Sequence, residues 1–203
     1  MQSISQLIPG YRINEYILVL QPHEELRSRI MQVRKSFQDT YNAFTAATFK
    51  PHIVLTTFTQ YEMLEERLVN RLKLTGMGFQ PFKVELKDYG CFPSHSIYIK
   101  VATRVPVQML MKELRAAQRL MKTDNEHKTH FFDEPYIAIA RKLQPWQFAA
   151  GWKAYSHRHF TGKFIADNML LLKRRAGDKS FQVAQRFEFM NLPVSTRQGE
   201  LFF

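Results

Sequence analysis

Two short stretches of the sequence share a pattern that could carry chemistry. In KPHIVLTTF, His52 follows a proline and precedes an apolar, β-branched run; in EPYIAIARK, Tyr136 stands at the same place. Both runs predict strands, on which side chains two apart point to one face. His52 would therefore share a face with Val54, and Tyr136 with Ala138. If the two strands face each other across a groove, all four side chains point into it.

The other reactive side chains form no comparable set. The chain has no glycine-rich phosphate loop and no Gly-x-Ser-x-Gly motif. His157 and His159 have the spacing of metal ligands on a strand but lack a third ligand in the sequence, so no metal site is predicted. Cys91 lies among aromatic and turn residues, where a small buried filler is the expected role.

Hydrophobic periodicity indicates which elements position the two stretches. It predicts helices over 22–40, 61–72, 107–121 and 145–155. It predicts strands over 16–20, 52–58, 82–92, 95–101, 135–141, 163–175 and 179–189. The glycines of TGMGF are expected to end the second helix, and 122–134 is expected to be a polar connector.

The order of these elements favours an α+β fold. Strands and helices are intermixed with several hairpin-like returns, which argues for antiparallel sheets rather than a doubly wound parallel sheet. Each half of the chain contains a helix, a proline-led strand, another helix and a strand pair. We therefore expect an internal duplication, with 1–203 forming a single domain of two interleaved lobes.

The bulk composition limits the partners and the compartment. The 203 residues carry a formal net charge of +11, which favours polyanions such as RNA, nucleotides or an anionic membrane face. A single cysteine indicates a reducing, cytoplasmic setting. The apolar runs are too short to cross a bilayer and no signal peptide is recognised, so no membrane insertion is expected. The oligomeric state stays open.

Taken together, these features resemble the 2H phosphoesterases, which include bacterial 2′-5′ RNA ligase-like proteins and 2′,3′-cyclic phosphodiesterases. The resemblance covers nearly the whole chain: the opening strand with its QP, then PHIVLTTF, GCFPSHSIYIKV, EPYIAIARK and the closing NMLLLKRRAGDKSFQVAQRFEF. It implies a bilobal α+β fold with pseudo-two-fold symmetry. In that fold two antiparallel sheets, flanked by helices, surround a central groove.

The family resemblance also implies a reaction. Members carry two His-x-Thr/Ser-x motifs, one per lobe, whose histidines act as base and acid on a phosphodiester while the hydroxyls stabilise the developing charge. Neither a metal nor another cofactor is required. This chain keeps His52 but has Val54, Tyr136 and Ala138 at the other three positions. A phenol titrates near ~10 and is a poor base at neutral pH.

Further side chains near the motifs are candidates for phosphate or substrate binding. Thr56 is expected on the face of His52, one pleat further along the strand. Arg141 follows the second motif, where many relatives carry a basic residue, although simple alternation points it away from Tyr136 and leaves a surface charge as the other interpretation.

Two histidines precede the second motif. His127 and His130 lie in the polar connector, and either could replace the missing imidazole. The alternative is that both are exposed loop histidines.

Three functions follow from this resemblance. The first is a protein that binds an RNA end or a nucleotide phosphate in the interlobe groove, with catalysis weakened or lost because of the replaced motif residues. The second is an active phosphodiesterase or RNA ligase-like enzyme on 2′,3′-cyclic or 2′-5′ substrates, using His52 with Tyr136 or a loop histidine. The third is a protein-interaction module. We expect His52 and Tyr136 at the catalytic positions in the first two cases.

Overall fold

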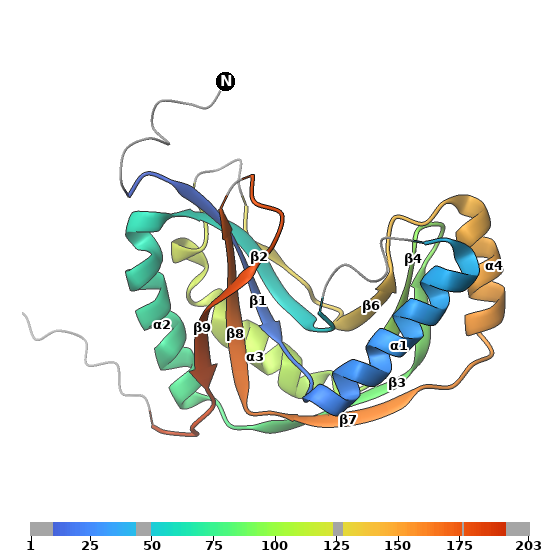
Figure 1. Ribbon diagram of the computed structural model, residues 1–203. Helices are drawn as coiled ribbons and strands as arrows, with labels where there is room; N and C mark the ends of the chain where they lie inside the picture. The colour runs from blue at the N-terminus through green and yellow to red at the C-terminus, as the bar shows by residue number, and fades with distance from the viewer. Residues whose placement is uncertain (1–9, 44–49, 124–127, 176, 194–203) are drawn as a thin grey trace, which may run out of the picture.

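Two antiparallel sheets form the two arms of a V in the computed structural model (Figure 1). It describes residues 10–43, 50–123, 128–175 and 177–193. The five-stranded sheet has the order β5-β2-β1-β8-β9 and contains β1 (Ile13–Leu20), β2 (Ile53–Tyr61), β5 (His130–Phe131), β8 (Asn168–Arg175) and β9 (Gln182–Glu188). The four-stranded sheet has the order β6-β4-β3-β7 and contains β3 (Phe82–Phe92), β4 (Ser96–Val101), β6 (Tyr136–Ala140) and β7 (Thr161–Ala166).

Helices cover one face of each sheet. They are α1 (Glu24–Tyr41), α2 (Glu65–Gly78), α3 (Val105–Arg115) and α4 (Pro145–Tyr155), with single 3-10 turns η3 (Glu62–Leu64) and η4 (Gln118–Leu120). Helices α1 and α4 pack against each other and against the four-stranded sheet, while α2 packs against β9 and α3. The predicted α+β fold with two antiparallel sheets is confirmed. None of the helices in the described ranges is long and apolar enough to cross a membrane.

The limits of helix α1 are fixed by capping residues at both ends, and one stripe of its side chains is buried. The Nδ1 atom of His23 accepts a hydrogen bond from the backbone of Leu26, and two glutamates follow in the first turn, where the helix dipole favours negative charge. The helix ends at Asn42, which is left-handed with φ 53°. Its buried stripe consists of Leu26, Ile30, Arg34 and Phe37. A charged residue therefore stands in an otherwise apolar row.

The glycines expected to end the second helix lie inside it. Helix α2 runs through Gly76 to Gly78. A Cβ on Gly76 would lie 3.0 Å from the carbonyl oxygen of Glu188 and 3.1 Å from the Cβ of Phe187. Gly76 thus allows α2 to approach the backbone of β9 closely, which is a packing role that local sequence signals do not distinguish from a helix stop.

The predicted closing strand pair is also corrected. The run 163–175 is two strands, because β7 pairs with β3 in one sheet and β8 pairs with β1 and β9 in the other. The backbone changes sheets at Asp167, whose carbonyl accepts a hydrogen bond from the backbone of Phe189. The polar connector 122–134 contains a short strand, β5, that the sequence reading missed.

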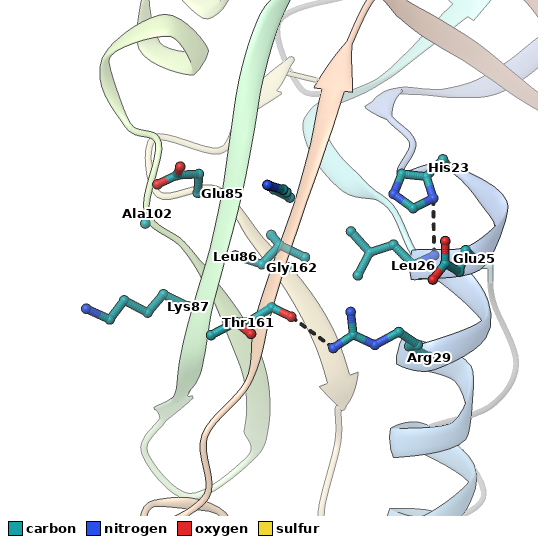
Figure 2. A pocket seen from close by; sticks show the side chains of 11 residues that line it. His23, Glu25, Leu26, Arg29, Glu85, Leu86, Lys87, Ala102, Thr161 and Gly162 are labelled. Atoms are coloured by element: carbon teal, nitrogen blue, oxygen red, sulfur yellow. Dashed lines mark hydrogen bonds between the residues drawn. The ribbon is translucent and has the colours of Figure 1, made fainter.

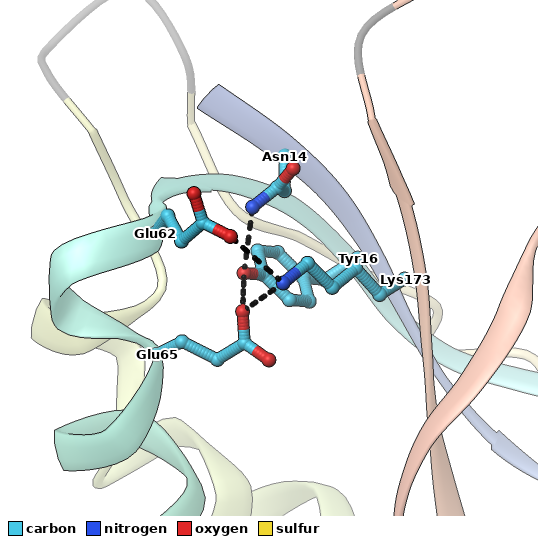
Figure 3. Close-up of polar contacts among 5 residues, drawn as sticks. All are labelled: Asn14, Tyr16, Glu62, Glu65 and Lys173. Carbon is cyan, nitrogen blue, oxygen red and sulfur yellow. Dashed lines mark hydrogen bonds and ion pairs between the residues drawn. The ribbon is translucent and has the colours of Figure 1, made fainter. Parts of the chain in front are cut away.

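A polar network ties the five-stranded sheet to the start of α2 (Figure 3). The Tyr16 hydroxyl donates to Glu65 at 2.7 Å and receives a hydrogen bond from Asn14 at 3.4 Å. Lys173 of β8 forms ion pairs with Glu65 and with Glu62, the latter at 3.6 Å. Burial, and then the nearby Glu65 carboxylate, raises the pKa of Tyr16. The phenol therefore stays protonated and donates.

Candidate functional site

Both motif strands carry a β-bulge at the same distance from the motif residue. In β2, Val54 pairs with Val19 but Thr56 pairs with Leu18, so Leu55 is an extra residue. In β6, Ala138 pairs with Tyr98 but Ala140 pairs with Ile97, so Ile139 is an extra residue. Each bulge lies three positions after His52 or Tyr136. This shared irregularity agrees with an internal duplication, and it reverses the side-chain alternation beyond it.

The bulge in β2 places Thr56 on the wrong face for a ligand. Thr56 is completely buried, and its hydroxyl donates to the carbonyl of His130 at 2.9 Å. The expectation that Thr56 shares the face of His52 is therefore wrong. Thr57 is partly exposed, like Val54, and is the hydroxyl that returns to this face.

The bulge in β6 has the opposite effect on Arg141. Simple alternation points Arg141 away from Tyr136, but one extra residue returns it to the same side. The guanidinium carbon of Arg141 lies 5.7 Å from the centroid of the Tyr136 ring. The geometry is a cation–π contact, and it places Arg141 beside the second motif residue.

His52 lies immediately before β2 in a positively charged environment. Its surface is only partly exposed. Burial, and then the charges of Arg34 and Arg141, lower its pKa to about 4, against a hydrogen bond to the Lys50 backbone that raises it. His52 is therefore neutral near pH 7. Because Arg141 acts on His52 and also covers the Tyr136 ring, it links the two motifs in space.

Arg34 is the site residue that the sequence reading missed. It is 5% exposed, and its Nε and Nη2 atoms donate to the carbonyl of Ala138 at 2.9 and 2.6 Å. Burial lowers the pKa of Arg34 to about 10, and the charge of Arg141 contributes to this decrease. A signal was present in the sequence, since a lone arginine four residues after Ile30 and three before Phe37 interrupts the apolar stripe of a helix.

Tyr136 belongs to an aromatic cluster on the four-stranded sheet. Ring centroids are 5.1 Å apart for Phe92 and Tyr136, 5.0 Å for Tyr98 and Tyr136, and 4.8 Å for Phe92 and Tyr98. All three rings are partly exposed. Gly90 makes room for Tyr98, because a Cβ there would lie 2.6 Å from the Tyr98 ring. We call Phe92, Tyr98 and Tyr136 the aromatic platform.

His130 lies on the short strand β5. Its backbone pairs with Thr57, its side chain is exposed, and its ring stands edge-on to Phe132 with centroids 4.4 Å apart. Directly paired residues of antiparallel strands share a face, so His130 and Thr57 lie on the same side of the sheet. His127 lies outside the described residues.

A cavity in the described part of the chain lies away from the two motif residues. A cavity of about 490 Å³ lies between the start of α1 and the strands β3 and β7 (Figure 2), and its lining includes neither His52 nor Tyr136. Within the described ranges, no group of three His, Cys, Asp or Glu side chains is placed to hold a metal ion.

Comparisons with known proteins give one matching family model and several similar folds. Residues 22–178 match the 2′-5′ RNA ligase superfamily. Comparison with curated protein sequences gives no match. LigT of E. coli complexed with 3′-AMP has a TM-score of 0.65 at 16% identity, over 87% of this chain and 98% of that one. The complex of LigT with NADP+ has a TM-score of 0.65 at 16% identity, over 88% and 99%.

A thermophilic protein has the same fold. TT0787 of Thermus thermophilus has a TM-score of 0.57 at 16% identity, over 87% of this chain and 98% of that one. At these identities the likeness concerns the fold.

Proposed function

Because the chain belongs to the 2′-5′ RNA ligase superfamily, we propose that its two motif strands bind the phosphate of an RNA end or a nucleotide, with catalysis weakened or lost. Solved structures of LigT, which has this fold, contain 3′-AMP and NADP+. The single cysteine of the chain supports a reducing, cytoplasmic setting for this role.

The observation that carries the proposal is the charge around His52. Both charged side chains that lower the pKa of His52 are arginines, Arg34 and Arg141. Arginine is suited to phosphate because its planar guanidinium offers several donors in a fixed arrangement. A bound phosphate would offset the mutual repulsion of the two guanidinium groups. It would also accept hydrogen bonds from Arg141 and from the imidazole in its protonated form, since a neutral imidazole has a single N–H to donate.

The replaced motif positions support weakened catalysis. Val54 and Ala138 have no hydroxyl to donate to a phosphate oxygen, and Tyr136 packs in the aromatic platform. Losing a general acid or base typically costs about 10²–10⁴ in rate. The loss of both hydroxyls adds to that cost. We therefore expect this arrangement to retain binding while turnover is weakened or lost.

The alternative is an active enzyme on 2′,3′-cyclic or 2′-5′ phosphodiesters. One observation favours it: His52 is neutral near pH 7 and is therefore in the form that accepts a proton. Tyr136 or His130 would then donate a proton to the leaving oxygen.

Calorimetric titration with 3′-AMP tests the proposal. We expect Arg141→Gln to weaken binding at least tenfold and His52→Gln to weaken it by a smaller factor. Lys153→Gln is the matched control, because it removes one exposed positive charge from α4, away from the motif strands. Absence of 3′-AMP binding, or equal effects of Arg141→Gln and Lys153→Gln, would contradict the proposal.

A turnover assay separates the two candidates. Wild type and His52→Gln are incubated with adenosine 2′,3′-cyclic phosphate and with 2′-5′ oligoadenylate, and the products are separated by chromatography. Binding without turnover supports the proposal. Turnover that His52→Gln abolishes supports the enzyme instead.

A further inference from the structure

The aromatic platform lies on the face of the four-stranded sheet that is opposite α4. Ile97 faces α4, because its side chain lies 3.3 Å from where a Cβ on Gly151 of that helix would be. Side chains alternate along β4, so Tyr98 points to the other face. We call this other face, which is partly solvent-exposed, the inner face.

Lysines continue the inner face away from the platform. Lys100 pairs directly with Tyr136 across β4 and β6, so their side chains are neighbours. On β3, a bulge between Leu86 and Tyr89 keeps both of these residues buried and leaves Lys87 exposed. In Figure 2, Lys87 extends from β3 on the side away from α1. Lys163 follows on β7 and is also exposed.

These lysines form a row across the sheet. The row crosses β4, β3 and β7, which are two strand spacings apart in the order β6-β4-β3-β7. It therefore spans about 10 Å at the usual strand spacing, and about 14 Å when Tyr136 on β6 is included. The row takes one exposed lysine from each of the three strands after β6: Lys100, Lys87 and Lys163. We call these three residues the lysine row. Its far end borders the 490 Å³ cavity, whose lining includes Lys87, Lys163 and Arg29.

Nearby carboxylates do not cancel the row. Glu85 pairs directly with Lys163 across β3 and β7, but it already forms an ion pair with Lys83 at 2.5 Å. The Lys83 ammonium lowers the pKa of Glu85. At the platform end, Glu134 is close enough to Tyr98 to contribute, after burial, to raising the pKa of that phenol. Asp88 lies beside Lys87, and its contact with His159, followed by weaker effects that include the Lys87 charge, lowers its pKa. Counting Lys83 with the row, four lysines stand against the three carboxylates of Glu85, Asp88 and Glu134, so the face keeps a small excess of positive charge.

Rings at one end and cations along the rest are the pattern of a single-strand binding surface. Any of the bases can stack on an aromatic side chain, because each has a flat π face. Lysines along the surface bind the phosphates of the backbone. A mononucleotide could occupy only the platform and the arginines. A surface of this length fits a longer ligand.

We propose that the inner face of the four-stranded sheet binds a single-stranded RNA of several nucleotides, with a base on the aromatic platform and the backbone along the lysine row. The inference rests on the proposed function, because it extends the same site beyond the terminal phosphate. It names single-stranded RNA, rather than free nucleotide, as the ligand class.

Paired titrations with 3′-AMP and with a 3′-phosphorylated octaadenylate test the inference. We expect the octamer to bind at least tenfold more tightly than 3′-AMP at low salt. Replacing the lysine row by alanine (Lys87→Ala, Lys100→Ala and Lys163→Ala together) should remove that advantage and leave 3′-AMP binding within about twofold. The slope of log affinity against log salt should decrease by about 2, at ~0.7 per phosphate contact.

The matched control removes three exposed lysines from the helices: Lys35→Ala, Lys73→Ala and Lys112→Ala. It changes net charge equally, so it should retain most of the octamer affinity. Tyr98→Ala tests the platform and should weaken both ligands about tenfold. Equal octamer affinities of the two triple variants, or an octamer no tighter than 3′-AMP, would overturn the inference. Octamer binding without 3′-AMP binding would instead contradict the proposed function, and it would support RNA binding by the lysine row.

Discussion

At the scale of single residues, the environment of His52 determines what the site can do. An isolated histidine titrates near neutral pH, and this one has a pKa of about 4 because of burial and then of Arg34 and Arg141. An anion bound beside it would favour the protonated form and raise that pKa. Ligand binding and proton uptake are therefore coupled, and the coupling is a measurable property of one side chain.

This coupling predicts a pH-dependent affinity. As pH falls from about 6.5 towards 4, binding of adenosine 2′,3′-cyclic phosphate should tighten, because the complex takes up a proton that the free protein does not hold. A diester is the suitable probe since the charge of its phosphate is constant in this range. Titration calorimetry in buffers of different ionisation enthalpy measures the proton uptake, and His52→Gln should flatten the profile. A wild-type affinity independent of pH would contradict this assignment.

Without ligand, the protonation of His52 makes the free energy of unfolding depend on pH. His52 has a lower pKa in the folded chain than in the unfolded chain, so the unfolded state takes up the proton first as pH falls. This contribution to stability is complete above about pH 6.5 and is lost as pH falls towards 4. The loss amounts to about 3 kcal/mol at most.

At the scale of elements, close packing decides where glycine is required. Helices α1 and α4 lie side by side on the four-stranded sheet, and Gly151 of α4 faces the Phe37 ring of α1. A Cβ on Gly151 would lie 2.7 Å from two carbons of that ring and 3.3 Å from Ile97. The arrangement that holds α1, and with it Arg34, depends on this contact.

Gly151→Ala is therefore expected to destabilise the protein. Overpacking costs typically about 1–3 kcal/mol, while replacing a helical glycine by alanine contributes only about 1 kcal/mol in the other direction. The free energy of unfolding from urea denaturation measures the net loss. Ala150→Gly, at an exposed position of the same helix, measures the propensity term alone. A higher urea midpoint for Gly151→Ala would contradict the packing argument.

At the scale of the whole molecule, the two sheets share one apolar core. Its buried residues come from both sheets and from α1 to α4, and the chain passes from β7 in one sheet directly to β8 in the other. We propose on this basis that the two lobes unfold together as a single domain. The two tryptophans, Trp146 and Trp152, both lie on α4, so their fluorescence reports on one arm of the V only.

Glu65→Gln tests this cooperativity from the other arm. The substitution removes the carboxylate that binds Lys173 and Tyr16, and should cost about 1–2 kcal/mol. We expect the urea midpoint followed by tryptophan fluorescence to fall together with the midpoint followed by circular dichroism, because one transition unfolds both sheets. A fluorescence midpoint that does not move would mean that the arms unfold separately.

Much of the fold was predictable because its signals are local. The alternation in 82–92 and the proline-led helix at 145–155 match β3 and α4 residue for residue. The α+β class followed from element order, and the quoted motifs indicated the family. The wrong predictions involve contacts between distant segments: Gly76 serves the approach of α2 to β9, and 163–175 is divided because β3 and β1 pair with different parts of it.

The sequence by itself determined the residue types at the motif positions, including the retained His52 and its replaced partners, since these are read directly. Tertiary structure alone decided which neighbours reach them. The two bulges exist only in paired strands, and they bury Thr56 while returning Arg141 to the side of Tyr136. Arg34 comes from α1, 104 residues before the Ala138 carbonyl to which it donates. The physical reason is that three properties of a site depend on strand pairing and burial: the sheet face on which a side chain lies, the pKa of a group and the positive charge around it. No single stretch of sequence contains strand pairing or burial.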